Sequence, residues 1–269
     1  MGDVIACANQ KGGVGKTTTV INLATYLALD GRRVLVVDLD PQGNATSGLG
    51  IDRATTRASI YPSHVEGLSP AELVQPTQVA GLWLIPSGRD LAGAEIELVD
   101  LPGREQKLRL ALAELRPKFD YILLDCPPAV GLLTVNALTA ADAVLVPIQC
   151  EYYALEGLSQ LLSTIDLVRD NLNPRLRLAG VLLTMFDART TLSSDVASEV
   201  RRHLGGSVFR TVVPRSVRLA EAPSYGRPIA RYSPESRGAQ AYRALAEEMI
   251  ERSTAFGRDG NPGAQVANA

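Results

Sequence analysis

Short apolar runs alternate with longer amphipathic stretches along most of this 269-residue chain. Apolar runs of four to six residues, rich in Val, Ile and Leu, are typical of parallel strands that are buried on both faces. These runs lie at Val4–Ala8, Arg33–Val37, Leu82–Ile85, Tyr121–Leu124, Ala143–Ile148, Ala179–Thr184 and Val208–Val213. Stretches with helical periodicity lie between or after them, at Thr17–Leu29, Glu105–Leu115, Leu133–Ala141, Leu155–Asn171, Ser193–Leu204 and Pro234–Arg252.

This alternation predicts an α/β fold, with a doubly wound, mostly parallel sheet flanked by helices and joined by right-handed crossovers. Ligands of such sheets bind at the carboxyl ends of the strands. The sequence contains no internal repeat, so we expect a single domain over residues 1–252. Gly257–Ala269 is small and polar, and we expect residues 253–269 to form a disordered tail.

A glycine-rich loop, Asn9-Gln10-Lys11-Gly12-Gly13-Val14-Gly15-Lys16-Thr17-Thr18, lies between the first predicted strand and the first predicted helix. The backbone N–H groups of such a loop can cradle nucleotide phosphates, while its lysine reaches the β- and γ-phosphates and its hydroxyl binds Mg²⁺. The sequence therefore predicts a P-loop nucleoside triphosphatase. Its predicted nucleotide-binding residues here are Lys11, Gly12, Gly13, Val14, Gly15, Lys16, Thr17 and Thr18.

The loop departs from the common G-x-x-x-x-G-K-[ST] pattern, because Gln10 stands where that pattern has its first glycine. It carries a second lysine, Lys11, at its front. Lys11 lies too far round the loop to duplicate Lys16 easily within one subunit. It could instead reach a phosphate that is bound by a second subunit.

Two of the predicted strands end in acids. Val37 is followed by Asp38-Leu39-Asp40, and strand alternation places Asp38 and Asp40 on the same side as the chain runs toward the phosphate site. Asp125 follows the apolar run at Tyr121–Leu124, which is the Walker B pattern. We expect Asp125 to hold Mg²⁺ together with Thr17. Asp38 and Asp40 can order a water molecule or hold the waters of Mg²⁺.

The overall charge is −2 and the isoelectric point is near 5.8, so the whole-chain field gives no reason to expect nucleic-acid binding. The distribution of charge is more informative. Residues 186–245 contain ten arginines and five acids, which makes this segment +5 and the rest of the chain −7. The arginines are Arg189, Arg201, Arg202, Arg210, Arg215, Arg218, Arg227, Arg231, Arg237 and Arg243.

The three cysteines, Cys7, Cys126 and Cys150, form no C-x-x-C pair, and we expect buried, reduced thiols in a cytoplasmic protein. The first residues enter a strand directly, without a basic leader. No apolar run approaches the roughly 20 residues that span a membrane.

The glycine loop resembles the deviant Walker A motif of the ParA/MinD group of ATPases. Asp38–Asn44 resembles the D-x-D-P-Q-G-N segment of ParA/Soj proteins. Gln149–Leu158, Thr184–Thr190 and Pro214–Pro223 are also similar to that family. The resemblance runs over nearly all of Met1–Ile250, which is far more specific than a loop motif.

The resemblance implies roles for individual residues. In that family the front lysine crosses a dimer interface and contacts the partner's nucleotide, a role that falls on Lys11. The second aspartate of the D-x-D segment positions the attacking water, which assigns that task to Asp40 with Asp38 in support. The adenine base commonly lies against loops after the late strands, so the candidates for contacting it are Met185, Pro214 and Ser216.

The family also binds DNA backbone without sequence preference, and the equivalent arginines here are Arg189 and Arg218, with Arg215 as a weaker candidate. The implied protein is a chromosome or plasmid partition switch. It would dimerise on ATP, bind non-specific duplex DNA and leave it after slow hydrolysis that a ParB-like centromere-binding protein stimulates. Such a protein is cytoplasmic and nucleoid-associated.

Three alternatives remain to be considered. A MinD-like membrane-cycling ATPase carries a C-terminal amphipathic helix, whereas Ser253–Ala269 has one bulky aromatic, Phe256, and no apolar stripe. A nitrogenase-type iron protein with the same loop needs paired cysteine ligands for an iron–sulfur cluster between subunits, and no second cysteine lies in a suitable loop beside Cys126. A small-substrate kinase or synthetase is harder to exclude. The chain has no N-K-x-D motif for guanine, which favours ATP.

Overall fold

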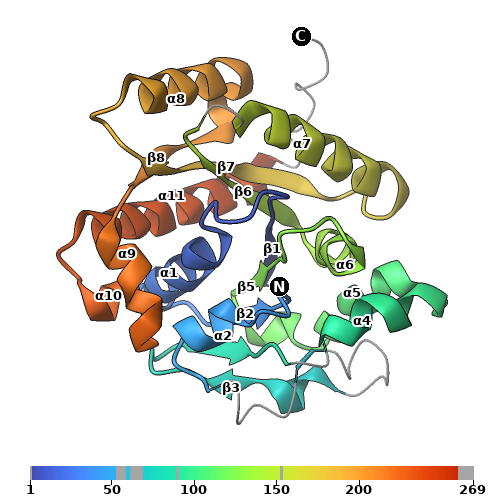
Figure 1. Ribbon diagram of the computed structural model, residues 1–269. Coiled ribbons are helices and arrows are strands. Elements are labelled where there is room, and N and C mark those ends of the chain that lie inside the picture. The colour runs from blue at the N-terminus through green and yellow to red at the C-terminus, as the bar shows by residue number, and fades with distance from the viewer. Residues whose placement is uncertain (1, 53–58, 61–68, 89–90, 152–153, 260–269) are drawn as a thin grey trace.

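The computed structural model describes residues 2–52, 59–60, 69–88, 91–151 and 154–259. Within them the strands form one eight-stranded sheet in the order β3-β4-β2-β5-β1-β6-β7-β8, parallel throughout except for β3 (Figure 1). The strands are β1 Asp3–Cys7, β2 Val34–Asp38, β3 Gln75–Pro76, β4 Leu82–Ile85, β5 Tyr121–Asp125, β6 Ala143–Gln149, β7 Arg177–Phe186 and β8 Val208–Pro214. The predicted doubly wound α/β fold is confirmed.

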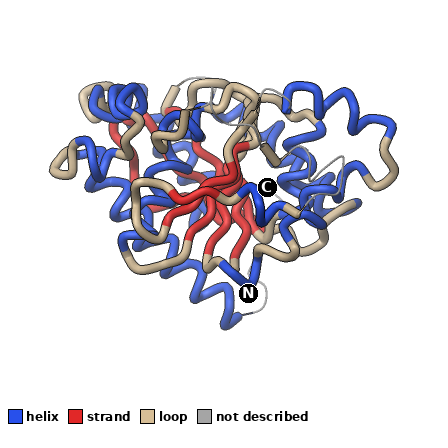
Figure 2. Tube along the Cα trace, turned by 90° about the horizontal axis from the view of Figure 1, so that it is seen from below, coloured by secondary structure: helices blue, strands red, loops and turns tan. Residues whose placement is uncertain are grey.

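Helices cover both faces of the sheet, so that the strands lie between two helical layers (Figure 2). The α-helices are α1 Lys16–Leu29, α2 Asn44–Gly48, α4 Leu91–Glu97, α5 Lys107–Leu112, α6 Leu132–Ala140, α7 Ala154–Asn171, α8 Thr191–Leu204, α9 Val217–Glu221, α10 Ile229–Tyr232 and α11 Arg237–Asp259. Short 3₁₀ turns lie at Pro70–Leu73, Leu98–Asp100, Arg104–Gln106, Arg116–Lys118, Gly205–Ser207 and Ala222–Tyr225.

The seven predicted strands are all present, and two predicted helices differ in extent. The stretch predicted as one helix over Glu105–Leu115 begins as a 3₁₀ turn at Arg104–Gln106 and continues as the short helix α5. The last helix starts at Arg237 and runs to Asp259, past its predicted end at Arg252. Residues 260–269, which belong to the predicted tail, lie outside the described residues.

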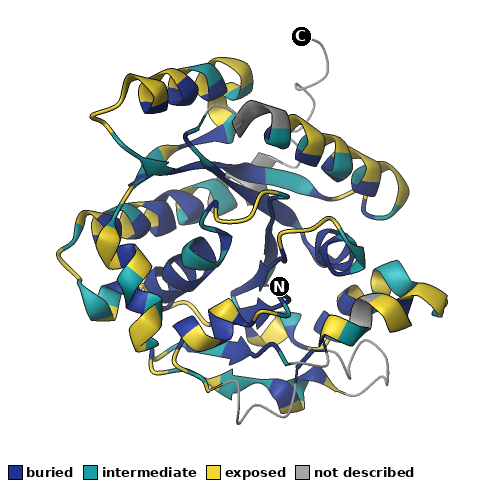
Figure 3. Cartoon of the chain, viewed as in Figure 1, coloured by how far each residue is buried: buried dark blue, intermediate teal, exposed yellow. Residues whose placement is uncertain are grey.

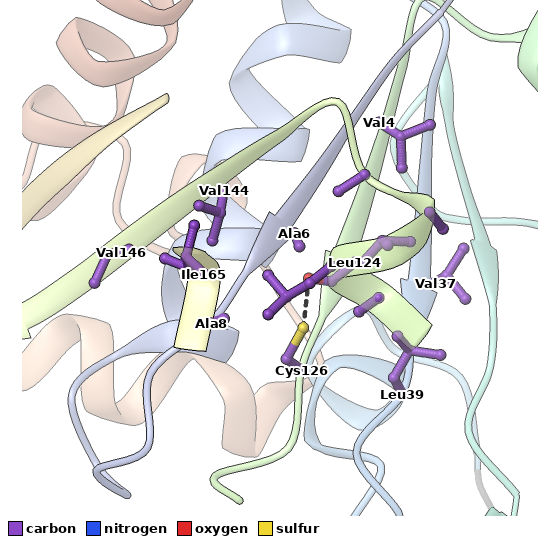
Figure 4. Close-up of a cluster of buried hydrophobic side chains, with 14 of the residues drawn as sticks. Val4, Ala6, Ala8, Val37, Leu39, Leu124, Cys126, Val144, Val146 and Ile165 are labelled. Carbon is purple, nitrogen blue, oxygen red and sulfur yellow. Dashed lines mark hydrogen bonds between the residues drawn. The ribbon is translucent and has the colours of Figure 1, made fainter. Parts of the chain in front are cut away.

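Two apolar clusters, one on each face of the sheet, form the core. Successive side chains of β1 point to opposite faces of the sheet, so Val4 and Ala6 belong to one cluster while Ile5 and Cys7 belong to the other. The first cluster packs against α5, α6, α7 and α8, and the second packs against α1 and α11. Figure 4 shows part of the first cluster, with Ile165 of α7 among strand residues. Figure 3 shows the same burial of the strands beneath helices with exposed outer faces.

Helices α1 and α11 lie side by side on one face and share a buried polar contact. The Tyr242 hydroxyl of α11 lies 3.2 Å from the Thr19 hydroxyl of α1, and both residues are buried. A buried hydroxyl without a hydrogen-bond partner costs free energy, so this contact fixes how the last helix sits on the helix that follows the glycine loop.

Tyr242→Phe should therefore lower the free energy of unfolding by about 1 kcal/mol, because it removes the hydrogen bond without opening a cavity. The measurement is urea unfolding followed by circular dichroism. Tyr225→Phe is the matched control, since the Tyr225 side chain is exposed and should tolerate the change. Equal stabilities of Tyr242→Phe and the wild type would show that the hydroxyl pair contributes nothing.

Candidate nucleotide-binding site

The glycine loop connects the carboxyl end of β1 to the start of α1, at the edge of the sheet where ligands of this fold bind. Gly13 and Gly15 have φ angles of +76° and +88°, a region that L side chains avoid. Gly15 is also the residue that precedes the first turn of α1. The backbone conformation therefore requires glycine at both positions, and it brings N–H groups to the amino end of a helix, which favours phosphate binding.

Two side chains, Asn9 of the loop itself and Thr184 of β7, join the loop to the neighbouring strands. The Asn9 amide donates to the carbonyl of Pro147 in β6 at 2.7 Å and accepts from the Lys11 N–H at 2.9 Å. The Thr184 hydroxyl of β7 lies 2.8 Å from the Val14 carbonyl and 2.9 Å from the Ile148 carbonyl. The loop is thus tied to β6 and β7, although the sequence assigned no role to Asn9 or Thr184.

The two lysines of the loop are placed differently. Lys16 is buried, and its ammonium donates across the loop to the carbonyl of Lys11 at 3.2 Å. This places the ammonium inside the loop, where bound phosphates would lie. The Lys11 side chain is 43% exposed at the front of the loop, and its ammonium pairs with Glu151 at 3.0 Å.

Two carboxylates lie side by side where neighbouring strands end. Asp38 of β2 is in register with Asp125 of β5, and neither residue is exposed. Burial, and then the neighbouring Asp38, raise the pKa of Asp125 well above its ordinary value, while Thr17 and Lys16 lower it in part. Burial also raises the pKa of Asp38, to about 6, against hydrogen bonds from Thr46 and Asp40 that lower it.

The surroundings of Asp125 fit a magnesium ion. Both of its carboxylate oxygens are buried, and neither has a hydrogen-bond partner among the described residues. The Thr17 hydroxyl lies close to this carboxylate and lowers its pKa. Within the part of the chain that is described, no three His, Cys, Asp or Glu side chains gather as a metal cage. Magnesium suits such a site, because it is usually held by one or two protein oxygens, substrate phosphates and water.

Asp38 is used differently from Asp125. Its Oδ2 accepts from the Thr46 N–H at 2.8 Å and from the Thr46 hydroxyl at 2.6 Å, and its Oδ1 accepts from the Asp40 N–H at 3.2 Å. The Thr46 hydroxyl in turn accepts from the Ser87 N–H at 2.9 Å. Asp38 therefore anchors α2 and the segment after β4. The sequence offered no signal for Thr46 or Ser87, because both contacts join separate elements.

Asp40 lies just past the end of β2 and is 8% exposed. Its carboxylate accepts from the Gln42 N–H at 2.9 Å, and its carbonyl accepts from the Ser87 hydroxyl at 2.7 Å. These bonds hold the backbone of Asp40 in place. The predicted role of Asp40 in positioning the attacking water stays a prediction.

The residues predicted to contact adenine lie at the same edge. Met185 is near the end of β7, and Phe186 beside it pairs with Pro214 at the end of β8. Ser216 follows immediately, before α9. Met185 has a φ of +50°, and no other non-glycine residue in the described segments has a positive φ. Such strain is common at functional sites. The adenine contacts stay a prediction.

The predicted DNA-binding arginines follow β7 and β8 and are exposed. Arg189 is 87% exposed and binds both carboxylate oxygens of Asp187, at 2.9 and 2.7 Å. These bonds hold the pKa of Asp187 well below its usual range, and the charge of Arg215 adds to the effect, so Arg189 and Arg215 flank one carboxylate. Arg218 is 60% exposed and pairs with Glu221 at 3.0 Å.

The glycine loop, the buried Lys16 and the carboxylates at the ends of β2 and β5 define a P-loop nucleoside triphosphatase. Residues 2–178 match the family described as an AAA domain. The chain is 55% identical over 249 residues to the sporulation initiation inhibitor protein Soj of Bacillus subtilis, covering 93% of this chain and 98% of Soj. It is 56% identical over 249 residues to the chromosome-partitioning ATPase Soj of Thermus thermophilus, covering 92% and 95%.

Among solved structures, the cobyrinic acid a,c-diamide synthase from Mycobacterium smegmatis with bound ADP and magnesium superposes with a TM-score of 0.83 at 40% identity, covering 97% of each chain. The chain belongs to the Soj/ParA family of chromosome-partitioning ATPases. It is an ATPase that uses ATP and Mg²⁺.

The buried Asp38 gives stability a defined pH dependence. Its folded-state pKa of about 6 exceeds the ordinary value of 3.8, so the folded protein binds this proton more tightly than the unfolded chain. The resulting contribution to stability is complete below about pH 4 and is lost as the pH rises through about 6.

Asp38→Asn removes this titration. Measured without nucleotide, the free energy of unfolding of the variant relative to the wild type should rise by about 1–3 kcal/mol between about pH 4 and pH 7. The free energy of unfolding of the variant should itself be lower than that of the wild type, because an N–H of the new side-chain amide then faces the backbone N–H of Asp40. Urea unfolding across this pH range tests the difference, with the exposed Asp166→Asn as a control. If the difference in free energy of unfolding between the variant and the wild type does not change with pH, the raised pKa of Asp38 is contradicted.

Proposed function

We propose that this ATPase is a DNA-partition switch. It dimerises when ATP binds, coats non-specific duplex DNA in the cytoplasm at the nucleoid, and leaves the DNA after hydrolysis that a ParB-like centromere-binding protein stimulates. The names of its relatives support partitioning as the process. We further propose that residues 1–252 act as one domain, that the end of α11 up to Asp259 extends this domain instead of starting the predicted tail, and that the remaining residues take no part in catalysis.

One observation carries this proposal: the phosphate loop and the exposed arginines share one edge of the sheet. The loop with Lys11 follows β1, Arg189 follows β7, and Arg215 and Arg218 follow β8, all at carboxyl ends of parallel strands. A dimer built around two nucleotides at this edge would place two sets of arginines in one assembly. Each guanidinium that meets a DNA phosphate releases counterions, so doubling the set strengthens binding steeply.

The proposed roles at the phosphates follow from the geometry. Lys16, buried inside the loop, neutralises the β- and γ-phosphates, and Lys11 reaches the partner's nucleotide. Thr17 and Asp125 hold Mg²⁺, which neutralises the charge that develops on the phosphate oxygens. Asp40 orients the attacking water, while Asp38 fixes α2 beside it. Met185, Pro214 and Ser216 contact the adenine.

The DNA-binding assay described in the next paragraph also tests the MinD-like alternative. None of the helices in the described ranges is long and apolar enough to cross a membrane. Vesicles of anionic phospholipid serve as a competing surface in the binding assay. ATP-dependent binding to vesicles without binding to DNA would replace the partition proposal with membrane cycling.

The test is binding to non-specific duplex DNA with ATP, with ADP and without nucleotide, over a salt series. We expect binding only with ATP, weakening steeply with salt. Arg218→Glu should weaken it at least about tenfold and reduce the salt slope by roughly 1–2 while ATP binding stays intact. Arg32→Glu is the matched control, because Arg32 is exposed at the opposite edge of the sheet, just before β2. No DNA binding in any state would refute the proposal.

Asp40→Ala should keep ATP binding and lower the hydrolysis rate by about 10²-fold or more, which traps a DNA-bound dimer. Lys16→Ala is the contrasting variant and should lose nucleotide binding altogether. Nucleotide affinity is measured with a fluorescent ATP analogue, and hydrolysis by phosphate release with DNA present. Normal turnover in Asp40→Ala would remove Asp40 from the mechanism.

A further inference from the structure

We infer that Glu151 is a positioning residue for Lys11. It holds the lysine within its own subunit until the partner's nucleotide competes for it, and so sets how readily the dimer forms. The inference rests on the proposed function, in which Lys11 acts across the dimer interface. It adds a residue just beyond the end of β6 that controls when Lys11 is available.

The contact itself is well defined. Lys11 Nζ lies 3.0 Å from Glu151 Oε2, and the two side chains are 43% and 44% exposed. The other carboxylate oxygen of Glu151 accepts from the Gln149 side-chain amide, and the Glu151 N–H donates to the Gln149 carbonyl at 2.8 Å. Glu151 is thus held on both sides at the end of β6, facing the front of the phosphate loop.

The backbone around Lys11 leaves only its side chain free to move. Its N–H donates to Asn9, and its carbonyl accepts from Lys16. Asn9 and Val14 are in turn joined to β6 and β7 through Pro147 and Thr184. Lys11 can therefore reach another subunit by rotating its side chain away from Glu151, without unfolding the loop.

The charges explain why this exchange depends on the partner's nucleotide. An exposed ion pair is weak, with an effect of about two- to fivefold on an equilibrium constant. The phosphates of ATP carry more negative charge than one carboxylate, so they can take the ammonium from Glu151. Without a nucleotide on the partner, the ion pair with Glu151 opposes release of the lysine.

The experiment measures dimerisation by sedimentation velocity over a range of protein concentrations, with Mg²⁺ and a slowly hydrolysed ATP analogue. It compares wild type, Glu151→Gln, Lys11→Ala and the double variant. Glu199→Gln is the matched control, because it makes the same change in an exposed ion pair with Arg202 and His203 on α8. Thermal unfolding verifies that each variant is folded.

Glu151→Gln should tighten the dimer roughly two- to fivefold, and Glu199→Gln should leave it unchanged. In the Lys11→Ala background, Glu151→Gln should have no effect, which a general change in stability or surface charge would not produce. If the wild type dimerises and Glu151→Gln matches it or dimerises more weakly, the role of Glu151 is wrong while the proposed function stands. If the wild type stays monomeric with the analogue, the ATP-dependent dimer fails and the role of Glu151 fails with it.

Discussion

The burial of two adjacent carboxylates is the constraint on which the rest of this site depends. Asp38 and Asp125 lie on neighbouring parallel strands, in register and away from solvent. Isolated, either charge would be costly in that environment. Asp38 is stabilised by hydrogen bonds from Thr46 and Asp40, whereas Asp125 has the orphaned oxygens that suit a cation. The two acids therefore differ in their surroundings: Asp38 is held by hydrogen bonds, and Asp125 is the acid for which we propose the role of metal ligand.

The same division appears among the positive charges. Lys16 is buried and donates to the Lys11 carbonyl across the loop, while Lys11, Arg189 and Arg218 are exposed and pair with carboxylates of their own chain. Exposed pairs of this kind contribute little to stability. In the function proposed above, their importance lies in exchange, because an exposed cation can leave its carboxylate for an external phosphate at little cost.

The sequence was sufficient for the elements whose signals are local. Apolar runs located the seven main strands, and the glycine loop with its two lysines located the phosphate site. Strand β3 was not predicted because it has only two residues and includes Pro76. Helix α2 was not predicted because it is a single turn that Asp38 holds in place. Helix α5 is shorter than its periodic stretch because a 3₁₀ turn precedes it. The contacts of Lys11 with Glu151, of Val14 with Thr184 and of Thr46 with Ser87 join distant elements, and no spacing in one sequence reveals such contacts.

The packing of α11 on α1 has a consequence for how the protein is made. The glycine loop and its helix precede in the sequence the elements that support them, because β1 lies between β5 and β6, and Tyr242 of the last helix contacts Thr19. Contacts over such sequence distances form late in folding. A ribosome-bound chain therefore carries the phosphate loop long before it can organise it. The contacts that fix the loop and α1 come from β6, β7 and α11, so they can form only after most of the domain has been synthesised.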